Sequence, residues 1–180
     1  MTRLILAAVA MAVMVVGCSG SSQESTTTST SSALASSTTL TETTNTTLAV
    51  EVIPPELEGW EVKEVRVGDR TLRLAIADNP TLRAQGLMGV TDLGDLDGML
   101  FYWRHVAHGG FWMKDTVIPL DIVWFLEDGT YAGRASMEPC QVDDCPTYTP
   151  GEGIDYRLAI EANPGDLDWI DETTIIVYSD

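Results

Sequence analysis

The chain has few positive charges. Ten Lys and Arg residues stand against 27 Asp and Glu residues in 180 positions, and the formal net charge at pH 7 is −17. Residues 49–180 hold 9 of the basic and 25 of the acidic residues, so this part carries 9 minus 25, or −16. Such a field repels the phosphates of nucleic acids and anionic lipids. We therefore expect no nucleic-acid partner, and an acidic surface that either keeps the protein in solution or attracts cationic partners.

Residues that build metal and phosphate sites are also scarce. The sequence has two histidines and three cysteines, and neither histidine lies near Cys140 or Cys145 in sequence. It contains no Gly-rich phosphate loop, nucleophile elbow or zinc-protease helix. The pair His105 and His108 is explained better by an exposed loop than by a divalent-ion site. We therefore expect neither a metal ion nor a cofactor.

No apolar run is long enough to cross a membrane. The longest, Leu4 to Val16 after the basic Arg3, has thirteen residues, whereas a spanning helix needs about 20. This run matches the apolar core of a secretory signal. The ending Val15-Val16-Gly17-Cys18 resembles the lipobox of bacterial lipoproteins, in which the cysteine is acylated and becomes the first residue of the mature protein.

The sequence therefore predicts a signal peptide over residues 1–17 and a lipid on Cys18 that holds the protein at the extracytoplasmic face of the cell membrane or envelope. The alternative is an ordinary signal peptide in which Cys18 has no role. Residues 18–48 are mostly Ser and Thr and include no aromatic residue. Such a segment buries too little apolar surface to offset its ordering entropy, so we expect a disordered tether.

Residues 49–180 have the length of one globular domain, long enough to bury a core without forming an oligomer. We expect a monomer. Cys140 and Cys145 stand four residues apart in a segment rich in Pro and acidic residues. In an exported protein, with Cys18 acylated, these two cysteines are expected to form a disulfide.

Alternating apolar residues predict a domain built mainly from strands. A turn pair, Gly68-Asp69, separates two alternating segments, and Asp78-Asn79-Pro80 is typical of a helix start. We expect a short helix from Pro80 to about Leu87 and a helical turn at 166–170. Strands are expected over 65–67, 72–76, 99–103, 111–113, 122–126, 131–137, 156–162 and 174–178. The predicted fold is α+β, mainly β: a compact barrel-like or curved antiparallel sheet with one or two short helices.

Three linked motifs carry a resemblance to a known family. They are Arg83-Ala-Gln-Gly-Leu-Met88, Gly98-Met-Leu-Phe101, and the segment from Phe111-Trp-Met-Lys-Asp-Thr116 to Asp121-Ile122. In order and spacing they are similar to the domain of unknown function 192 family, and a looser fourth block lies at 158–162. The resemblance spans about Val65 to Val177. It implies a compact, mostly β domain with a small helix, and it implies no reaction, because the family has no assigned activity.

The chain departs from the family pattern at two motif positions. It has Val90 where the family usually has a basic residue, and Asp115 where the family usually has Asn. A third departure is the segment after Gly165, which is short and acidic and lacks the longer helical passage typical of the family before the last strand.

The motif residues suggest a ligand pocket. Polar side chains beside an aromatic floor are typical of small-ligand sites. The expected pocket consists of Arg83, Met88, Phe101, Trp112, Lys114, Thr116, Asp121 and Glu161. An alternative explains the charges structurally, with Arg83 paired to Asp121 or Glu161 in the core. Likewise Trp103, Trp112 and Trp124 either stack against a ligand or fill the core.

The sequence favours a lipid-anchored extracytoplasmic module that binds a small molecule or glycan, or assists another envelope protein. One alternative is an envelope hydrolase that uses Asp121 and Glu161 as a paired acid and base on a glycosidic bond. Another is a structural partner of an envelope protein. An enzyme is disfavoured because the sequence offers few candidates for a base or nucleophile.

Overall fold

The computed structural model describes residues 51–179. The predicted signal peptide (1–17), Cys18 and the tether (18–48) lie outside the described residues. Within 51–179, no helix is long and apolar enough to cross a membrane. The elements are a 3-10 helix η1 (Pro55–Leu57), one α-helix α1 (Pro80–Gln85), and the strands β1 (Val62–Val67), β2 (Arg70–Ala77), β3 (Gly98–Ala107), β4 (Phe111–Trp112), β5 (Leu120–Phe125), β6 (Tyr131–Met137), β7 (Thr147–Tyr148), β8 (Tyr156–Ala162) and β9 (Ile176–Val177).

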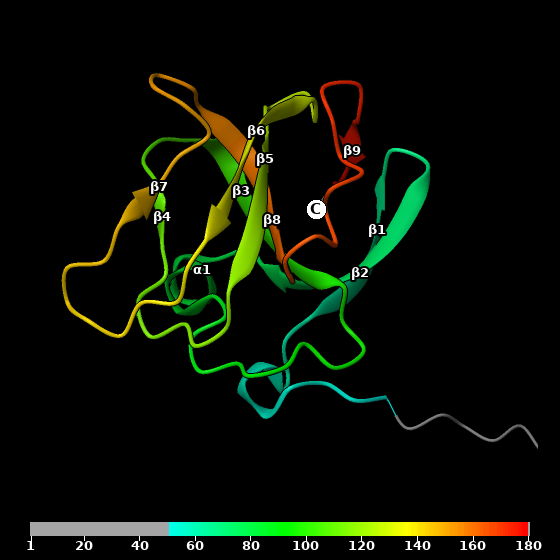
Figure 1. The fold of residues 1–180 in the computed structure, drawn as a ribbon. Coiled ribbons are helices and arrows are strands. Elements are labelled where there is room, and N and C mark those ends of the chain that lie inside the picture. Colours follow the sequence, from blue (N-terminus) through cyan, green and yellow to red (C-terminus); the bar gives the residue numbers. More distant parts are fainter. Residues whose placement is uncertain (1–50, 180) are drawn as a thin grey trace, which may run out of the picture. The chain divides into compact units, whose positions relative to one another are not determined.

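Seven strands form one strongly curled sheet in the order β6-β5-β8-β3-β2-β1-β9, and β4 pairs with β7 in a separate two-stranded sheet (Figure 1). The pairs in the large sheet are antiparallel except β2 with β3, which is parallel. The curl brings β9 to the β5–β6 hairpin, where the Ile176 amide donates to the Gly129 carbonyl at 2.9 Å and Thr130 bridges Ile175. The predicted mainly β, barrel-like fold is confirmed.

The predicted helix start is confirmed at α1. The Asn79 side chain accepts hydrogen bonds from the Thr81 and Leu82 amides, and Pro80 occupies the first turn, where an amide hydrogen is not needed. The helix ends at Gly86, whose φ of +51° lies in the left-handed region that glycine adopts at little cost. This end of α1 places the chain from residue 83 to residue 88 against the curled sheet (Figure 1).

The two faces of the sheet pack two different apolar clusters. One cluster contains Met99, Phe101, Ile122 and Trp124 with residues of the loops around β4. The other lies on the opposite face and contains the alternate residues of the same strands, together with Leu167. Because side chains alternate along a strand, the register decides which polar residue joins which cluster.

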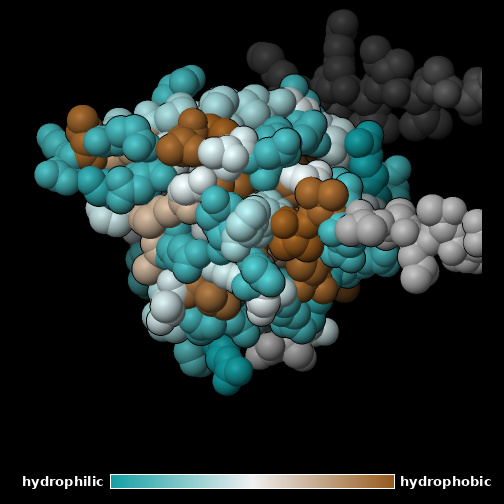
Figure 2. All heavy atoms as spheres, turned by 90° about the horizontal axis from the view of Figure 1, so that it is seen from below, coloured by the Kyte–Doolittle hydropathy of each residue, from teal (hydrophilic) through white to brown (hydrophobic). Residues whose placement is uncertain are grey.

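The sequence located most strands but not all elements. The helix η1 and the strand β7 were not expected, and residues 166–170, expected as a helical turn, form hydrogen-bonded turns. The predicted disulfide between Cys140 and Cys145 is present. Figure 2 shows one face of the molecule, on which hydrophilic residues cover most of the surface and apolar residues gather in separate small patches.

Candidate functional site

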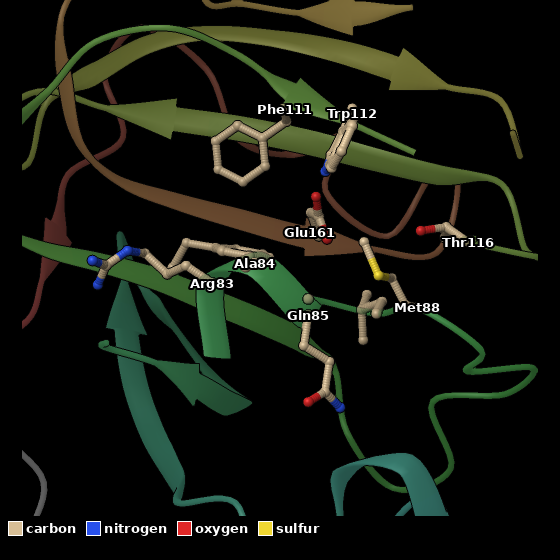
Figure 3. Close-up of a pocket in the computed structure, with 11 residues that line it drawn as sticks. Arg83, Ala84, Gln85, Met88, Phe111, Trp112, Thr116 and Glu161 are labelled. Atoms are coloured by element: carbon tan, nitrogen blue, oxygen red, sulfur yellow. The ribbon is translucent and has the colours of Figure 1, made fainter. Parts of the chain in front are cut away.

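A small cavity lies between the end of α1, strands β3, β4 and β8, and the segment after β4 (Figure 3). Its volume is about 30 Å³, which is room for a group the size of one or two water molecules. It opens to solvent, and 11 residues line it: Arg83, Ala84, Gln85, Gly86, Leu87, Met88, Phe101, Phe111, Trp112, Thr116 and Glu161. Six of the eight residues expected from the sequence are among them.

Glu161 is the buried acid of this cavity. It lies on β8 and is only 4% exposed. Within residues 51–179 its carboxyl group makes no hydrogen bond or ion pair. Burial therefore acts on it without compensation and raises its pKa to about 8, because removal from water disfavours the charged form. A carboxyl group that titrates near neutral pH inside a cavity is typical of binding and catalytic sites.

Asp121 is buried too, but it does not belong to this cavity. On β5, Ile122 pairs with Glu161 while Asp121 pairs with Ala162, so the two acids point to opposite faces of the sheet. The Asp121 carboxylate accepts hydrogen bonds from the Ser136 hydroxyl at 2.6 Å and the Gly165 amide at 2.7 Å. Asp121 therefore ties β6 and the turn after β8 to β5. The acid–base pair considered from the sequence does not form.

Arg83 pairs with neither acid. Its Nη1 donates to the Tyr102 carbonyl at 2.9 Å, and its guanidinium lies 5.0 Å from the centre of the Trp103 ring. In Figure 3 the guanidinium points away from Glu161. Burial lowers the pKa of Arg83, and Asp78 partly opposes this effect. The expected ion pair is wrong, because the aromatic ring of Trp103 and a backbone carbonyl occupy the guanidinium instead.

Lys114 lies outside the cavity lining. Its ammonium group donates to the Asp143 carboxylate at 2.8 Å and the Val142 carbonyl at 3.2 Å. Both partners belong to the loop between Cys140 and Cys145. Lys114 thus binds the disulfide loop to the segment after β4, and the pocket expected from the sequence loses this residue as well as Asp121.

Asp115 has a backbone role. Among the described residues it is the one non-glycine residue with positive φ, at +55°, a region that Asp and Asn tolerate better than most side chains. Its amide donates to the Cys140 carbonyl, and its carbonyl accepts from the Gly89 amide. Asp tolerates this positive φ as Asn does, and the next residue, Thr116, lines the cavity.

Aromatic rings form the wall around Glu161. Phe111 meets Phe101 edge to face, with 4.9 Å between the ring centres, and Trp112 stands at the mouth, 53% exposed. The three tryptophans considered from the sequence lie in different surroundings. Trp124 is fully buried in the core, and the Trp103 ring contacts the Arg83 guanidinium. Of the three, only Trp112 lines the cavity.

Two motif glycines allow the close approaches around the cavity. A Cβ at Gly98 would overlap the Glu161 carbonyl oxygen, so glycine is needed where β3 meets β8. A Cβ at Gly86 would lie 3.4 Å from the Phe101 ring, and the positive φ there already favours glycine. Phe111 and residues 84–87 also line the cavity, although they were not among the residues expected there from the sequence. The available signal for Phe111 was its place in the motif that begins Phe111-Trp112, whose second residue was expected in the pocket.

Comparison with known proteins agrees with this description. Residues 63–175 match the family model DUF192, described as uncharacterized ACR. The chain belongs to the domain of unknown function 192 family. The match covers α1, the cavity and the disulfide loop, so the site lies within the family's domain. The predicted membership is confirmed, and the family has no assigned activity.

Two solved structures share the fold. A protein of unknown function from Novosphingobium aromaticivorans DSM 12444 is 26% identical, with a TM-score of 0.57, over 73% of this chain and 94% of that one. A protein from Sinorhizobium meliloti 1021, described as a candidate transcription regulator, is 22% identical with a TM-score of 0.57 over 66% and 94%. The second likeness concerns the fold alone. No curated protein matches the chain.

Proposed function

We propose that this member of the domain of unknown function 192 family is a lipid-anchored extracytoplasmic binding module whose ligand site is the cavity around Glu161. The observation that carries the proposal is the buried Glu161 carboxyl group, which has no partner within residues 51–179. A fully buried polar group without a partner costs about 1–3 kcal/mol, and Glu161, which keeps 4% exposure in the open cavity, bears a part of this cost. A ligand that supplies the missing hydrogen bond or charge recovers this free energy on binding.

The shape of the cavity supports a ligand with one small polar end. The space beside Glu161 is about 30 Å³, which admits one functional group rather than a whole molecule. The rest of a ligand would lie against Trp112 and Met88 at the mouth, where apolar surface is accessible. Apolar walls with few convergent polar groups are characteristic of small-molecule sites.

The proposed location rests on two features of the chain. The Cys140–Cys145 disulfide is of a kind that persists mainly in oxidising, extracytoplasmic compartments. The lipobox-like ending at Cys18 and the Ser- and Thr-rich segment after it support a lipid anchor followed by a tether. A tether of about thirty flexible residues has a root-mean-square span of roughly 30 Å, which keeps the domain clear of the lipid head groups.

The test is a thermal-shift screen of the mature chain, with Cys18→Ser, against amines, amino acids, sugars and small carboxylic acids. A ligand of this site raises the unfolding midpoint of the wild type and of Glu64→Gln, in which the same chemical change is made on the exposed side of β1. The shift is absent in Glu161→Gln. If every shift persists in Glu161→Gln, or if no compound shifts the wild type, the proposal is wrong. Conversion of the ligand in the same samples would show turnover, and capture of one envelope protein without any small-molecule shift would favour the structural role.

A further inference from the structure

We propose, on the basis of the ligand site proposed above, that the Glu161 cavity takes the protonated amino group of a small organic amine, whose carbon skeleton lies against the Trp112 ring. Three properties of the cavity support an ammonium group: its charge, its aromatic lining and its size. The charge disfavours anions, the aromatic lining disfavours neutral hydroxyl groups, and the size disfavours large cations.

The charges around the cavity favour a cation. Glu161 is its buried acid, and no basic group neutralises it: the Arg83 guanidinium is held by Tyr102 and Trp103. The ammonium group of Lys114 is held by the disulfide loop. The excess of acidic residues in the domain adds a negative potential. An anionic ligand would find no unengaged cation in the lining and would be repelled by the ionised form of Glu161, so the charges favour a cation over an anion.

The aromatic rings favour a cation over a neutral hydroxyl group. Phe101, Phe111 and Trp112 line the cavity together with Glu161, and Figure 3 shows Phe111 and Trp112 on the same side of the Glu161 carboxyl group. Aromatic faces attract ammonium groups, and they do so most strongly where water is removed. A hydroxyl group gains no comparable attraction from the rings. A carboxyl group in a cavity lined by aromatic side chains is therefore suited to an ammonium group, which can form an ion pair with the carboxylate and lie against the rings.

The size and composition of the cavity exclude a metal ion and a large cation. About 30 Å³ holds an –NH₃⁺ group, which is close to a water molecule in size. Within residues 51–179 no three His, Cys, Asp or Glu residues lie together as a metal site requires. A divalent ion would find a single carboxylate, far short of the six or more oxygen ligands that calcium takes.

Binding of an amine changes the protonation of Glu161. The empty site holds the carboxyl group mostly protonated at pH 7, since its pKa is about 8. An ammonium group pairs with the ionised form, so each binding event releases nearly one proton at pH 7. The proton leaves the Glu161 carboxyl group for the buffer, and the amine stays protonated throughout.

The other titratable groups near the cavity do not produce this signal. From α1, Arg83 lines the cavity, but its guanidinium points away from Glu161 and keeps its charge near pH 7. Lys114 and Asp115, after β4, point to the disulfide loop and to solvent. From β8, Tyr156 packs against Phe111 and has a pKa raised by burial to about 12. From β5, Asp121 points to the opposite face of the sheet. Proton release near pH 7 therefore reports on Glu161.

The experiment is isothermal titration calorimetry on the mature chain with Cys18→Ser, in two buffers of different ionisation enthalpy. The probes are three matched pairs: methylamine and methanol, benzylamine and benzyl alcohol, and 1,4-diaminobutane and 1,4-butanediol. The probes reach about 10 mM, so that a Kd of about 1 mM is detected. At least one amine should bind more tightly than its alcohol and release close to one proton at pH 7. Below pH 8, the affinity of this amine should rise up to about tenfold for each unit by which the pH is raised.

The variants separate this inference from the ligand site itself. Glu161→Gln should abolish amine binding and proton release, while Glu64→Gln should keep both. If only alcohols, or the sugars and acids of the thermal-shift screen, bind in a Glu161-dependent way, the proposed ligand site is supported and the proposal of an amine ligand is wrong. If no amine binds, or if amines bind equally to Glu161→Gln, the amine is also wrong. If no compound of any class depends on Glu161, the ligand site fails with it.

Discussion

Asp121 and Glu161 lie on adjacent strands, β5 and β8, and point to opposite faces of the same sheet. Both are buried and acidic, but their surroundings differ. Asp121 accepts two hydrogen bonds, whereas the Glu161 carboxyl group has no partner within residues 51–179. Fully bonded carboxylates stabilise a fold, and buried carboxyl groups without partners cost free energy and are typical of functional sites.

Replacing Asp121 should destabilise the fold without touching the cavity. In Asp121→Ala the Ser136 hydroxyl and the Gly165 amide lose their acceptor, and the free energy of unfolding should fall by about 2–4 kcal/mol. Ser136→Ala, which removes one hydrogen bond, should lower it by about 1 kcal/mol. Urea unfolding of the three proteins checks this order. Equal stability of Asp121→Ala and the wild type would contradict the assigned role.

Glu161 should make the protein less stable as the pH rises. Its folded pKa is about 8 against an ordinary value of 4.5, so between these values the folded state keeps a proton that the unfolded state has lost. The contribution of Glu161 is therefore fully present below about pH 4.5, and the folding equilibrium constant falls up to about tenfold per pH unit towards pH 8.

Glu161→Gln removes this titration, so its stability should fall less steeply between pH 5 and pH 8 than that of the wild type. Urea unfolding at several pH values, with Glu64→Gln as the control, measures the difference in slope. Parallel curves for the wild type and Glu161→Gln would show that the folded pKa of Glu161 is not raised.

Glycine and a β-branched residue at position 115 should have different effects on the free energy of unfolding. The φ of Asp115 is +55°, where an ordinary side chain costs about 1–2 kcal/mol. Asp115→Gly should leave the free energy of unfolding unchanged or raise it slightly, whereas Asp115→Val should lower it by about 1–2 kcal/mol. Thermal unfolding of both variants is sufficient. A loss of stability as large in Asp115→Gly as in Asp115→Val would mean that the side chain, and not the conformation, matters.

The disulfide should contribute modestly to stability. Four residues lie between Cys140 and Cys145, whose sequence separation is 5, and closing so short a loop is worth about 2 kcal/mol in the chain-entropy model. The double variant Cys140→Ser, Cys145→Ser should lose about this much in urea unfolding and remain folded. Lys114, which binds the loop at Val142 and Asp143, should become more accessible to amine-modifying reagents. If the accessibility of Lys114 does not change, the disulfide loop does not hold its ammonium group in place.

The predicted lipid can be tested on the full chain in a bacterial host. With Cys18 intact, the protein should fractionate with membranes and gain the mass of an acylated cysteine after cleavage behind Gly17. With Cys18→Ser, acylation should be lost and the protein should leave the membrane fraction. Acylation elsewhere, or membrane retention of the variant, would refute the lipobox prediction and leave an ordinary export signal.

Local sequence patterns determined much of the fold. Alternation located most strands of the sheet, including β8 with its bounds, and Asn79 with Pro80 located the start of α1. The short spacing of Cys140 and Cys145 led to the disulfide. These features depend on residues close together along the chain, where backbone preferences and side-chain alternation act directly.

The site required the tertiary structure. The motifs indicated that Arg83, Trp112, Thr116 and Glu161 belong together, and they line one cavity. Which side each residue faces depends on strand register, and a shift of β5 by one residue against β8 would pair Asp121 with Glu161 and place both acids on one face. Register follows from the packing of strands about forty positions apart in sequence. That packing, and not the composition of either strand, gives the Asp121 carboxylate two hydrogen-bond donors. It leaves the Glu161 carboxyl group in the cavity without a partner among the described residues.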